Sequence, residues 1–374
     1  MEYFKSIITL AFSILLSLIL AEFFLFTIGK YSNLINTDFQ NSNTIWENKP
    51  FKVESISHPD LGITVYSNYD EKGIRENIDF QSNTAESFIG FFGDSFLANR
   101  NIEYKYTISS LFNEFINLNK VLNFGVDGFG LEQSYQRWKN NNNILFSDVV
   151  YFFTDNDITD LERVNLFTII SDNDNFQLIN NYEENNYSND DLTFKQIIGK
   201  FRITYLFIDS YYQIRAFYFL LKKKLISDIK KSTISNYQPY QGELSARFIN
   251  EDLSAHDQEL IKKFNIILNR WKSEVEEMGN TFHLAILPRD WDLQLLPIIL
   301  KNNPNQFNII YLSGPKNIET MKEFKFAFKN DGHWNEIGNL AAFSSIVDYF
   351  NLNSKYVNRD DFFSNKLEDI LSYY

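Results

Sequence analysis

The chain has 374 residues, 44% of them hydrophobic, which is enough for one large domain, or for two domains, with a sizeable buried core. Its formal net charge is −13. A surface this acidic repels phosphate backbones, so we expect no nucleic acid among its partners. The sequence holds no cysteine, which excludes disulfides, thiolate metal sites and a cysteine nucleophile.

The first strongly patterned segment is an apolar run over residues 7–29, interrupted by one charge, Glu22. About 20 apolar residues span a bilayer, and a carboxylate near the end of such a run can reach the interface. A cleaved signal peptide is the alternative. Its apolar part is usually about 7–15 residues long and its cleavage site needs small residues, whereas Ile19 stands two residues before Ala21. We therefore predict a single-pass transmembrane anchor over residues 1–30.

The remainder of the chain begins as a polar tether and then becomes regular. Residues 31–85 form this tether and a preamble, in which 58–76 holds two short alternating runs broken by glycine, a pattern that predicts a strand pair. Apolar strands then alternate with helices over 86–160 and again over 251–350. Such alternation predicts a three-layer α/β/α sandwich of the flavodoxin-like type, with a parallel sheet of about five strands.

The expected elements of this core follow from the period of the apolar residues. Strands are predicted at residues 87–93, 121–128, 148–157, 281–288 and 307–314, and helices at residues 101–118, 131–141, 253–279, 291–300 and 335–350. Residues 161–250 interrupt the alternation as a mostly helical insertion. Within it, 171–192 is acidic and Asn-rich and indicates a loop, while 200–231 has helical spacing and is either packed on the core or forms a lid or membrane-facing surface. Residues 351–374 are a C-terminal extension.

Ser95 follows the first core strand directly, in the turn Gly93-Asp94-Ser95. Ligands of open α/β sheets bind at the carboxyl ends of the strands, so this turn places the Ser95 hydroxyl at the binding edge. Gly-Asp-Ser is by itself also a common turn sequence, and it indicates a nucleophile only in combination with other signals.

The next two strand ends carry glycine-rich or polar segments. Residues 123–130 include three glycines, which leave backbone N–H groups open to close approach. Their spacing is not that of a dinucleotide loop, and an ordinary turn is the alternative. Residues 154–157 place Asn156 where its side chain can donate to an oxyanion. Helix capping by Asp157 is the alternative there, and the segment does not fit the EF-hand calcium pattern.

His333 has the strongest catalytic signature among the four histidines. It lies on a glycine-bearing loop before the last core helix, with a carboxylate, Asp331, two residues earlier. A carboxylate so placed can fix the tautomer of the imidazole and stabilise the imidazolium. The other three histidines, His58, His256 and His283, are interpreted as structural or surface residues.

These four segments, in this order, resemble the four signature blocks of the SGNH (GDSL-type) hydrolase family. The resemblance covers residues 87–157 and 281–350. It implies that Ser95 is the nucleophile, that His333 is its general base and that Asp331 orients the histidine. It further implies an oxyanion hole formed by the N–H of Ser95, the N–H of Gly128 and the side chain of Asn156.

Two positions depart from the pattern of the family. Thr154 stands two residues before the Asn of the third block, where the family usually has glycine. The family often places its Asp three residues before the His, and Asn330 occupies that position here, so Asp331 is the nearest carboxylate. The first departure favours a non-catalytic protein of the same fold. The second makes the role of Asp331 less secure than that of His333.

The resemblance implies a serine esterase or O-acyltransferase, with acetyl as the expected acyl group, acting on cell-envelope or extracellular glycan. The N-terminal segment is similar to membrane-anchored members, which implies that the body lies on the extracytoplasmic side and works with envelope-polysaccharide assembly proteins. The alternatives are a non-catalytic glycan-binding or assembly subunit of the same fold and a lipid esterase with 200–231 as its lid. The sequence indicates no cofactor, metal or nucleotide site. A hydrogen bond between Ser95 and His333 would favour the enzyme.

Overall fold

A computed structural model describes the protein over residues 2–27, 37–38, 44, 47–48, 50–51, 53–76, 84–164, 166–172, 175–180, 247–248, 253–288, 290–300, 307–312, 326–328, 332–352, 354–355 and 357–374. The chain divides into two compact units, one of Met1–Asn36 with Tyr187–Tyr237 and one of Thr37–Asn186 with Gln238–Tyr374. In the first unit the described element is helix α1 (Glu2–Thr27). Over the part of the chain that the structure describes, no helix is both long enough and apolar enough to cross a membrane.

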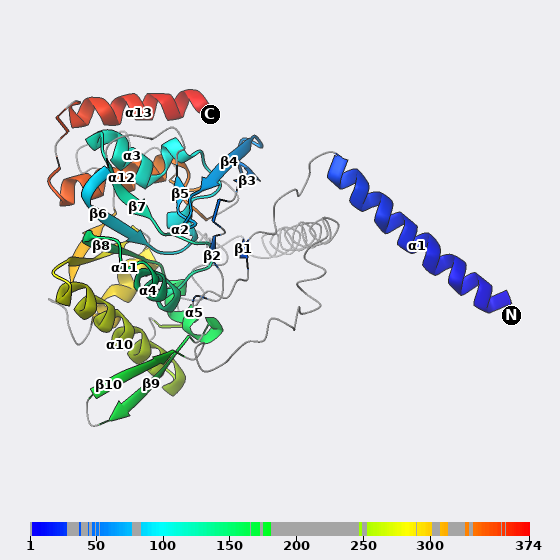
Figure 1. Cartoon of the computed structure of the whole chain (residues 1–374), viewed down its shortest axis with the longest axis horizontal. Coiled ribbons are helices and arrows are strands. Elements are labelled where there is room, and N and C mark those ends of the chain that lie inside the picture. The colour runs from blue at the N-terminus through cyan, green and yellow to red at the C-terminus, as the bar shows by residue number, and fades with distance from the viewer. Residues whose placement is uncertain are drawn as a thin grey trace, which may run out of the picture. The chain divides into compact units, whose positions relative to one another are not determined.

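The second unit is built on a five-stranded parallel sheet, as predicted (Figure 1). Its strands are β6 (Thr84–Phe92), β7 (Asn119–Asn123), β8 (Phe146–Phe153), β11 (Thr281–Ile286) and β12 (Asn308–Tyr311). They lie in the order β12-β11-β8-β6-β7, and all neighbours run parallel. Of these five strands, β6 comes first in the chain and lies between the second, β7, and the third, β8. The chain passes from β6 to β7 on one side and then crosses back past β6 to β8 on the other, so the carboxyl ends of β6 and β8 form the topological switch point of the sheet.

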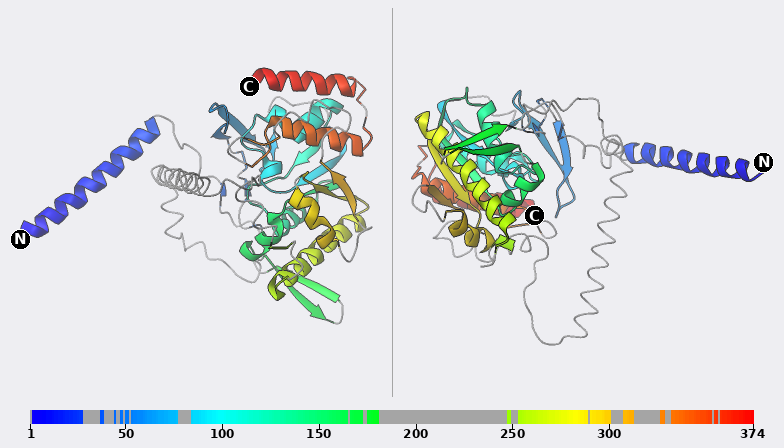
Figure 2. Two further views of the ribbon diagram at one scale, coloured as in Figure 1. Left: turned by 180° about the vertical axis from the view of Figure 1, so that it is seen from behind. Right: turned by 90° about the horizontal axis from the view of Figure 1, so that it is seen from below.

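Helices cover both faces of this sheet, and the predicted three layers are confirmed (Figures 1 and 2). One face carries α3 (Ile108–Ile116), α12 (Glu336–Tyr349) and α13 (Arg359–Tyr373). The other carries α4 (Leu131–Asn140), α5 (Asn156–Val164), α10 (Ala255–Glu277) and α11 (Asp290–Ile299). Each layer buries its own apolar cluster against the sheet, so the strands are apolar on both faces, as a covered parallel sheet requires.

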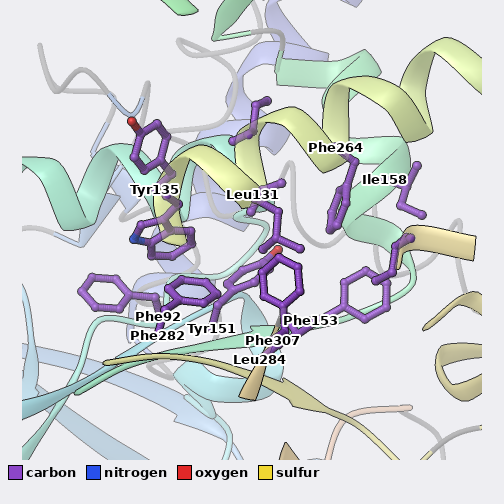
Figure 3. Packing of buried hydrophobic residues seen from close by; sticks show 14 of the residues in the cluster. Phe92, Leu131, Tyr135, Tyr151, Phe153, Ile158, Phe264, Phe282, Leu284 and Phe307 are labelled. Carbon is purple, nitrogen blue, oxygen red and sulfur yellow. The ribbon is translucent and has the colours of Figure 1, made fainter. Parts of the chain in front are cut away.

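The core between the sheet and α10 is largely aromatic (Figure 3). Trp271 of α10 is fully buried, and its ring lies 5.7 Å from that of Phe92, 5.2 Å from that of Tyr151 and 5.3 Å from that of Phe282. Neighbouring residues of one strand serve opposite faces, since Phe91 belongs to the cluster under α3 and α12. Much of the aromatic content of the chain is therefore used in packing. Burying one such side chain stabilises the fold by about 1.5–3 kcal/mol.

The preamble forms a small antiparallel sheet of β3 (Val53–Ser57), β4 (Thr64–Tyr69) and β5 (Arg75–Glu76). The predicted strand pair is therefore present, with a third short strand added. Buried Arg75 binds this sheet to the core, because its guanidinium donates to the carbonyls of Asn99 at 2.5 Å and Ile102 at 2.6 Å. The preamble is thus part of the same compact unit as the parallel sheet.

Three local predictions were wrong. The strand expected over 148–157 ends at Phe153, and Asn156 already begins α5. The expected loop over 171–192 is a strand in part, because β9 (Phe167–Asp172) and β10 (Asn175–Asn180) pair antiparallel. The loop was predicted from the acidic, Asn-rich composition, but Asn and Asp here flank alternating apolar residues, and partly buried Leu178 packs on the core. The helix expected over 101–118 begins only at Ile108. The Thr107 side chain caps its amino end by accepting from the N–H of Ser110, after a 3₁₀ turn at Tyr104–Tyr106.

After residue 180 the predicted insertion, including 200–231, lies outside the described residues apart from residues 247–248. The C-terminal extension, for which no fold was predicted, contributes α13 to the core. Phe362, Phe363 and Ile370 of this helix are buried in the cluster under α3 and α12.

Candidate active site

Ser95 lies at the switch point of the sheet. Strand β6 ends at Phe92, Gly93 follows, Asp94 is the N-cap, and Ser95 is the first residue of the short helix α2 (Ser95–Ala98). A side chain on Gly93 would bring its Cβ to 3.0 Å from Cβ of Phe152 on β8, so glycine permits the close passage of the turn. The half-buried serine is therefore presented at the binding edge, as the sequence predicted.

His333 meets Ser95 across 238 residues of sequence. The distance between its Nε2 and Oγ of Ser95 is 2.7 Å, which is a hydrogen bond of normal length. Its ring lies 5.0 Å from the ring of Phe96, tilted by 38°. The serine hydroxyl can therefore pass its proton directly to the imidazole nitrogen, which is the geometry that a serine nucleophile and its general base require.

The His333 loop is held on both sides. Its carbonyl accepts the N–H of Phe328 at 3.1 Å, and the N–H of Asn335 donates to the carbonyl of Phe326 at 3.0 Å. Ala327 and Trp334 form an antiparallel bridge across the loop. Asn335 then caps α12 by accepting the N–H of Gly338 at 3.0 Å. Backbone contacts thus fix the peptide that carries the imidazole.

The segments after Ser95 and after His333 are joined by two buried amides. Asn99, which ends α2 in the left-handed region at φ 46°, donates from Nδ2 to Oδ1 of Asn339 at 2.8 Å. It also donates to the carbonyl of Phe96. Asn339 in turn donates to the carbonyl of Asn335 at 3.0 Å. Neither asparagine was singled out in the sequence, because their partnership spans 240 residues and leaves no local pattern.

Thr154, which departs from the family pattern, supports the turn that holds Ser95. Its hydroxyl donates to Oδ2 of Asp94 at 3.0 Å, and Oδ1 of Asp94 accepts the N–H of Phe96 at 2.9 Å. Thr154 and Asp94 are both buried. The departure therefore replaces a glycine by a hydroxyl that fixes the N-cap beside Ser95, and it leaves the turn intact.

A buried carboxyl group, Asp157, lies behind this turn. It accepts hydrogen bonds from the hydroxyl of Tyr151 at 2.7 Å and from the N–H of Thr154 at 2.8 Å, both on Oδ2. Burial raises the pKa of Asp157 well above its ordinary value, and the charge of Asp94 raises this pKa further. The protonated form of Asp157 is therefore favoured beside the Asp94 carboxyl group.

The predicted oxyanion donors lie at the ends of the two strands that flank β6. Gly128 follows β7 with φ 75°, a conformation that glycine adopts without strain. Asn156 begins α5 just after β8, and its Nδ2 donates to Oδ2 of Asp160 at 3.0 Å. Since a carboxamide nitrogen carries two hydrogens, this contact orients the side chain and leaves a second N–H for another acceptor.

The remaining predictions divide between described and undescribed residues. Asp331 lies outside the described residues. His256 is exposed beside Glu162, as expected of a surface residue. His58 and His283 are both buried, and each is hydrogen bonded to a carboxylate at 2.9 Å. Within the described ranges, no group of three or more His, Asp or Glu residues is placed to hold a metal ion.

Comparison with known proteins gives results for structure but not for sequence. No protein-family model matches the chain, and no curated protein matches it. A solved member of the lipolytic protein G-D-S-L family from Veillonella parvula DSM 2008 is 10% identical with a TM-score of 0.36, covering 71% of this chain and 98% of its own. A putative lipolytic protein of the G-D-S-L family from Desulfitobacterium hafniense DCB-2 is 8% identical with a TM-score of 0.34, covering 71% and 100%. The family that the four sequence segments resemble is thus found among similar solved structures. At these TM-scores the similarity assigns neither an activity nor a residue role to this chain.

Proposed function

We propose that this chain is a serine ester hydrolase or O-acyltransferase, with Ser95 as nucleophile and His333 as general base. The observation that supports it most directly is the 2.7 Å contact between His333 Nε2 and Ser95 Oγ at the switch point of the sheet. Two groups that are far apart in the sequence and meet with this geometry are the minimum set for acyl transfer through a covalent intermediate.

The reaction would proceed through two tetrahedral intermediates. Oγ of Ser95 attacks the carbonyl carbon of an ester while its proton moves to Nε2 of His333. The N–H groups of Ser95 and Gly128 and the amide of Asn156 would donate to the oxyanion, each contributing roughly 10²–10³ in rate. Collapse breaks the bond to the alcohol, which leaves with the proton from His333. Water or a second hydroxyl then attacks the acyl-enzyme by the reverse sequence of proton transfers.

A hydrolase and a transferase would use the same residues. They would differ only in whether water or a second hydroxyl accepts the acyl group. We propose acylated, in particular O-acetylated, cell-envelope or extracellular glycan as the substrate class. The support for it is the sequence resemblance of the N-terminal segment. A single-pass anchor with an extracytoplasmic body, and contact with envelope-polysaccharide assembly proteins, belong to the same proposal, and the anchor is supported only by the apolar sequence over residues 7–29. The proposed orientation role of Asp331 rests on its position two residues before His333.

A non-catalytic subunit with this fold is the second candidate, and two sequence features favour it, Thr154 and the long insertion over 161–250. The contacts of Thr154 argue against the first of these features, since its hydroxyl donates to Asp94 while Ser95 stays next to His333. The family-typical glycine is therefore not required for this turn to form.

The test is hydrolysis of p-nitrophenyl acetate and release of acetate from acetylated xylan by the full chain, with Ser95→Ala beside it. Loss of a catalytic serine typically lowers kcat by about 10⁴–10⁶-fold. Ser147→Ala is the matched control. Ser147 is also half-buried, and it lies near the amino end of β8, where its hydroxyl donates to the carbonyl of Phe88 at 3.3 Å. Activity should be lost in the first variant and kept in the second.

Equal and negligible rates in all three proteins would remove the hydrolase reading. Labelling by a fluorophosphonate would then decide between a strict transferase and a non-catalytic subunit. Modification of wild-type chain but not of Ser95→Ala would show an activated serine, and absence of labelling would overturn the proposed nucleophile.

A further inference from the structure

His58 is buried in the turn that connects β3 and β4. Its Nε2 lies 2.9 Å from Oε1 of Glu336, and neither of the two side chains is exposed to solvent. Glu336 is the first residue of α12, three positions after His333. A preamble residue therefore reaches the start of the helix that follows the catalytic loop.

The hydrogen bonds of His58 determine its tautomer. Its Nδ1 accepts the backbone N–H groups of Asp60 at 3.2 Å and Leu61 at 3.0 Å. Because a backbone N–H can only donate, Nδ1 carries no hydrogen, and the hydrogen of the neutral ring is on Nε2. His58 thus donates to Glu336, while the turn at Asp60 and Leu61 keeps the ring in this orientation.

The same ring touches the other side of the His333 loop. It packs edge-on against Phe328, with centroids 5.2 Å apart at 89°. The N–H of Phe328 donates to the carbonyl of His333 at 3.1 Å. His58 therefore contacts both the residue bonded to the His333 peptide and the residue that starts α12. Tyr374 extends the cluster, since its hydroxyl donates to Oε2 of Glu336 at 2.5 Å.

We propose that His58 is a positioning residue for the catalytic base: through Glu336 and Phe328 it holds the His333 loop at the distance from Ser95 that proton transfer needs. This proposal rests on the proposed function, which supplies the role of His333 as the general base. It gives the preamble a role in the chemistry, because the turn before β4 supplies the His58 imidazole, which contacts the loop that carries His333. A displacement of about 1 Å in such a geometry can cost roughly 10²-fold in rate.

His283 provides a matched control at the other end of the sheet. It is also buried, its Nε2 lies 2.9 Å from Oδ1 of Asp148, and its ring packs edge-on against Tyr349 with centroids 5.5 Å apart. His58→Phe and His283→Phe each keep a ring and remove a hydrogen bond from a buried histidine to a carboxylate. Both should lower stability, but only His58→Phe should reach the active site.

The kinetic experiment compares these two full-length variants with wild type on p-nitrophenyl acetate. We expect kcat of His58→Phe to fall about 10–10²-fold with KM changed less than about threefold, and kcat per folded molecule of His283→Phe to stay near wild type. Glu336→Gln keeps the shape of the helix start and replaces the carboxylate. It should show a smaller fall in kcat, and it provides the comparison if His58→Phe does not fold.

A readout independent of turnover is the ¹⁵N spectrum of the imidazoles, which is simple in a chain with four histidines. Ser95→Ala removes the hydroxyl partner of His333 and marks the signal of an imidazole without it. The His333 signal in His58→Phe, or in Glu336→Gln, should move toward that reference, and in His283→Phe it should not.

An unmoved His333 signal in both variants, or an equal response to His283→Phe, would overturn the proposal. Lack of hydrolysis by wild type would count against the proposed function alone, and the spectra would still decide where His333 is held.

Discussion

At the scale of single residues, Thr154 makes the sharpest prediction. Its hydroxyl donates to buried Asp94, whose other oxygen caps Phe96 beside Ser95. Thr154→Val keeps the volume and removes this donor. A buried group deprived of a hydrogen bond costs about 1–3 kcal/mol, so thermal stability should fall. Because the turn under Ser95 then loosens, kcat should fall by about tenfold, which is less than the roughly 10²-fold cost of a 1 Å misplacement.

Thr154→Ser is the control for this contact, because it retains the hydroxyl and loses only a methyl group. Its kcat should stay within about twofold of wild type, since no group around the reacting atoms loses a partner. Melting temperature and the kinetics of p-nitrophenyl acetate hydrolysis, measured together, separate the two variants. A Val variant as active as the Ser variant would show that the contact with Asp94 does not support the nucleophile.

At the scale of secondary-structure elements, α2 and α12 are joined by one amide pair, Asn99 and Asn339. Asn99→Gly should separate backbone from side-chain effects, because glycine accepts the left-handed φ of 46° while the contact between the helices is lost. We expect kcat to fall about tenfold with a modest loss of stability, since Ser95 and His333 sit at the amino ends of the two joined segments.

Asn117→Gly is the matched control for this change. Asn117 ends α3 in the same left-handed conformation, at φ 51°, and is exposed. Its replacement should leave kcat unchanged, because its side chain makes no contact between the segments that carry Ser95 and His333. Equal kinetics of the two glycine variants would contradict the role of the Asn99–Asn339 contact.

The same elements show how far sequence patterns reach. Short continuous apolar runs predicted all five strands of the sheet, because a strand buried on both faces is apolar at nearly every position. Ser95 and His333 could be found because each lies in a local sequence signature. His58 was interpreted only as a structural or surface residue, and Asn99 was not singled out. Their partners, Glu336 and Asn339, are more than 200 residues away, and such contacts depend on packing that no local pattern records.

At the scale of the whole molecule, buried Asp157 makes stability depend on pH. Burial and the charge of Asp94 raise its pKa in the folded state well above its ordinary value. Below the unfolded pKa of about 3.9 the group is protonated in both states and carries no penalty. As pH rises from there through the folded pKa, the unfolded chain loses its proton first. Stability from this group therefore falls with rising pH across that window, by about 1.4 kcal/mol for each pKa unit of displacement.

Asp157→Asn should remove this dependence while keeping the local structure. Both contacts of Asp157, from Tyr151 and from the N–H of Thr154, fall on one oxygen, which the carboxamide oxygen can replace. The like-charge interaction with Asp94 disappears at the same time. The melting temperature of the variant relative to wild type should therefore be least favourable near the unfolded pKa of about 4 and should improve as pH rises toward the folded pKa of Asp157, by about 2–4 °C for each kcal/mol relieved. A difference that stays constant over this range, or that worsens as pH rises, would mean that Asp157 is ionised in the folded protein and is stabilised by its donors.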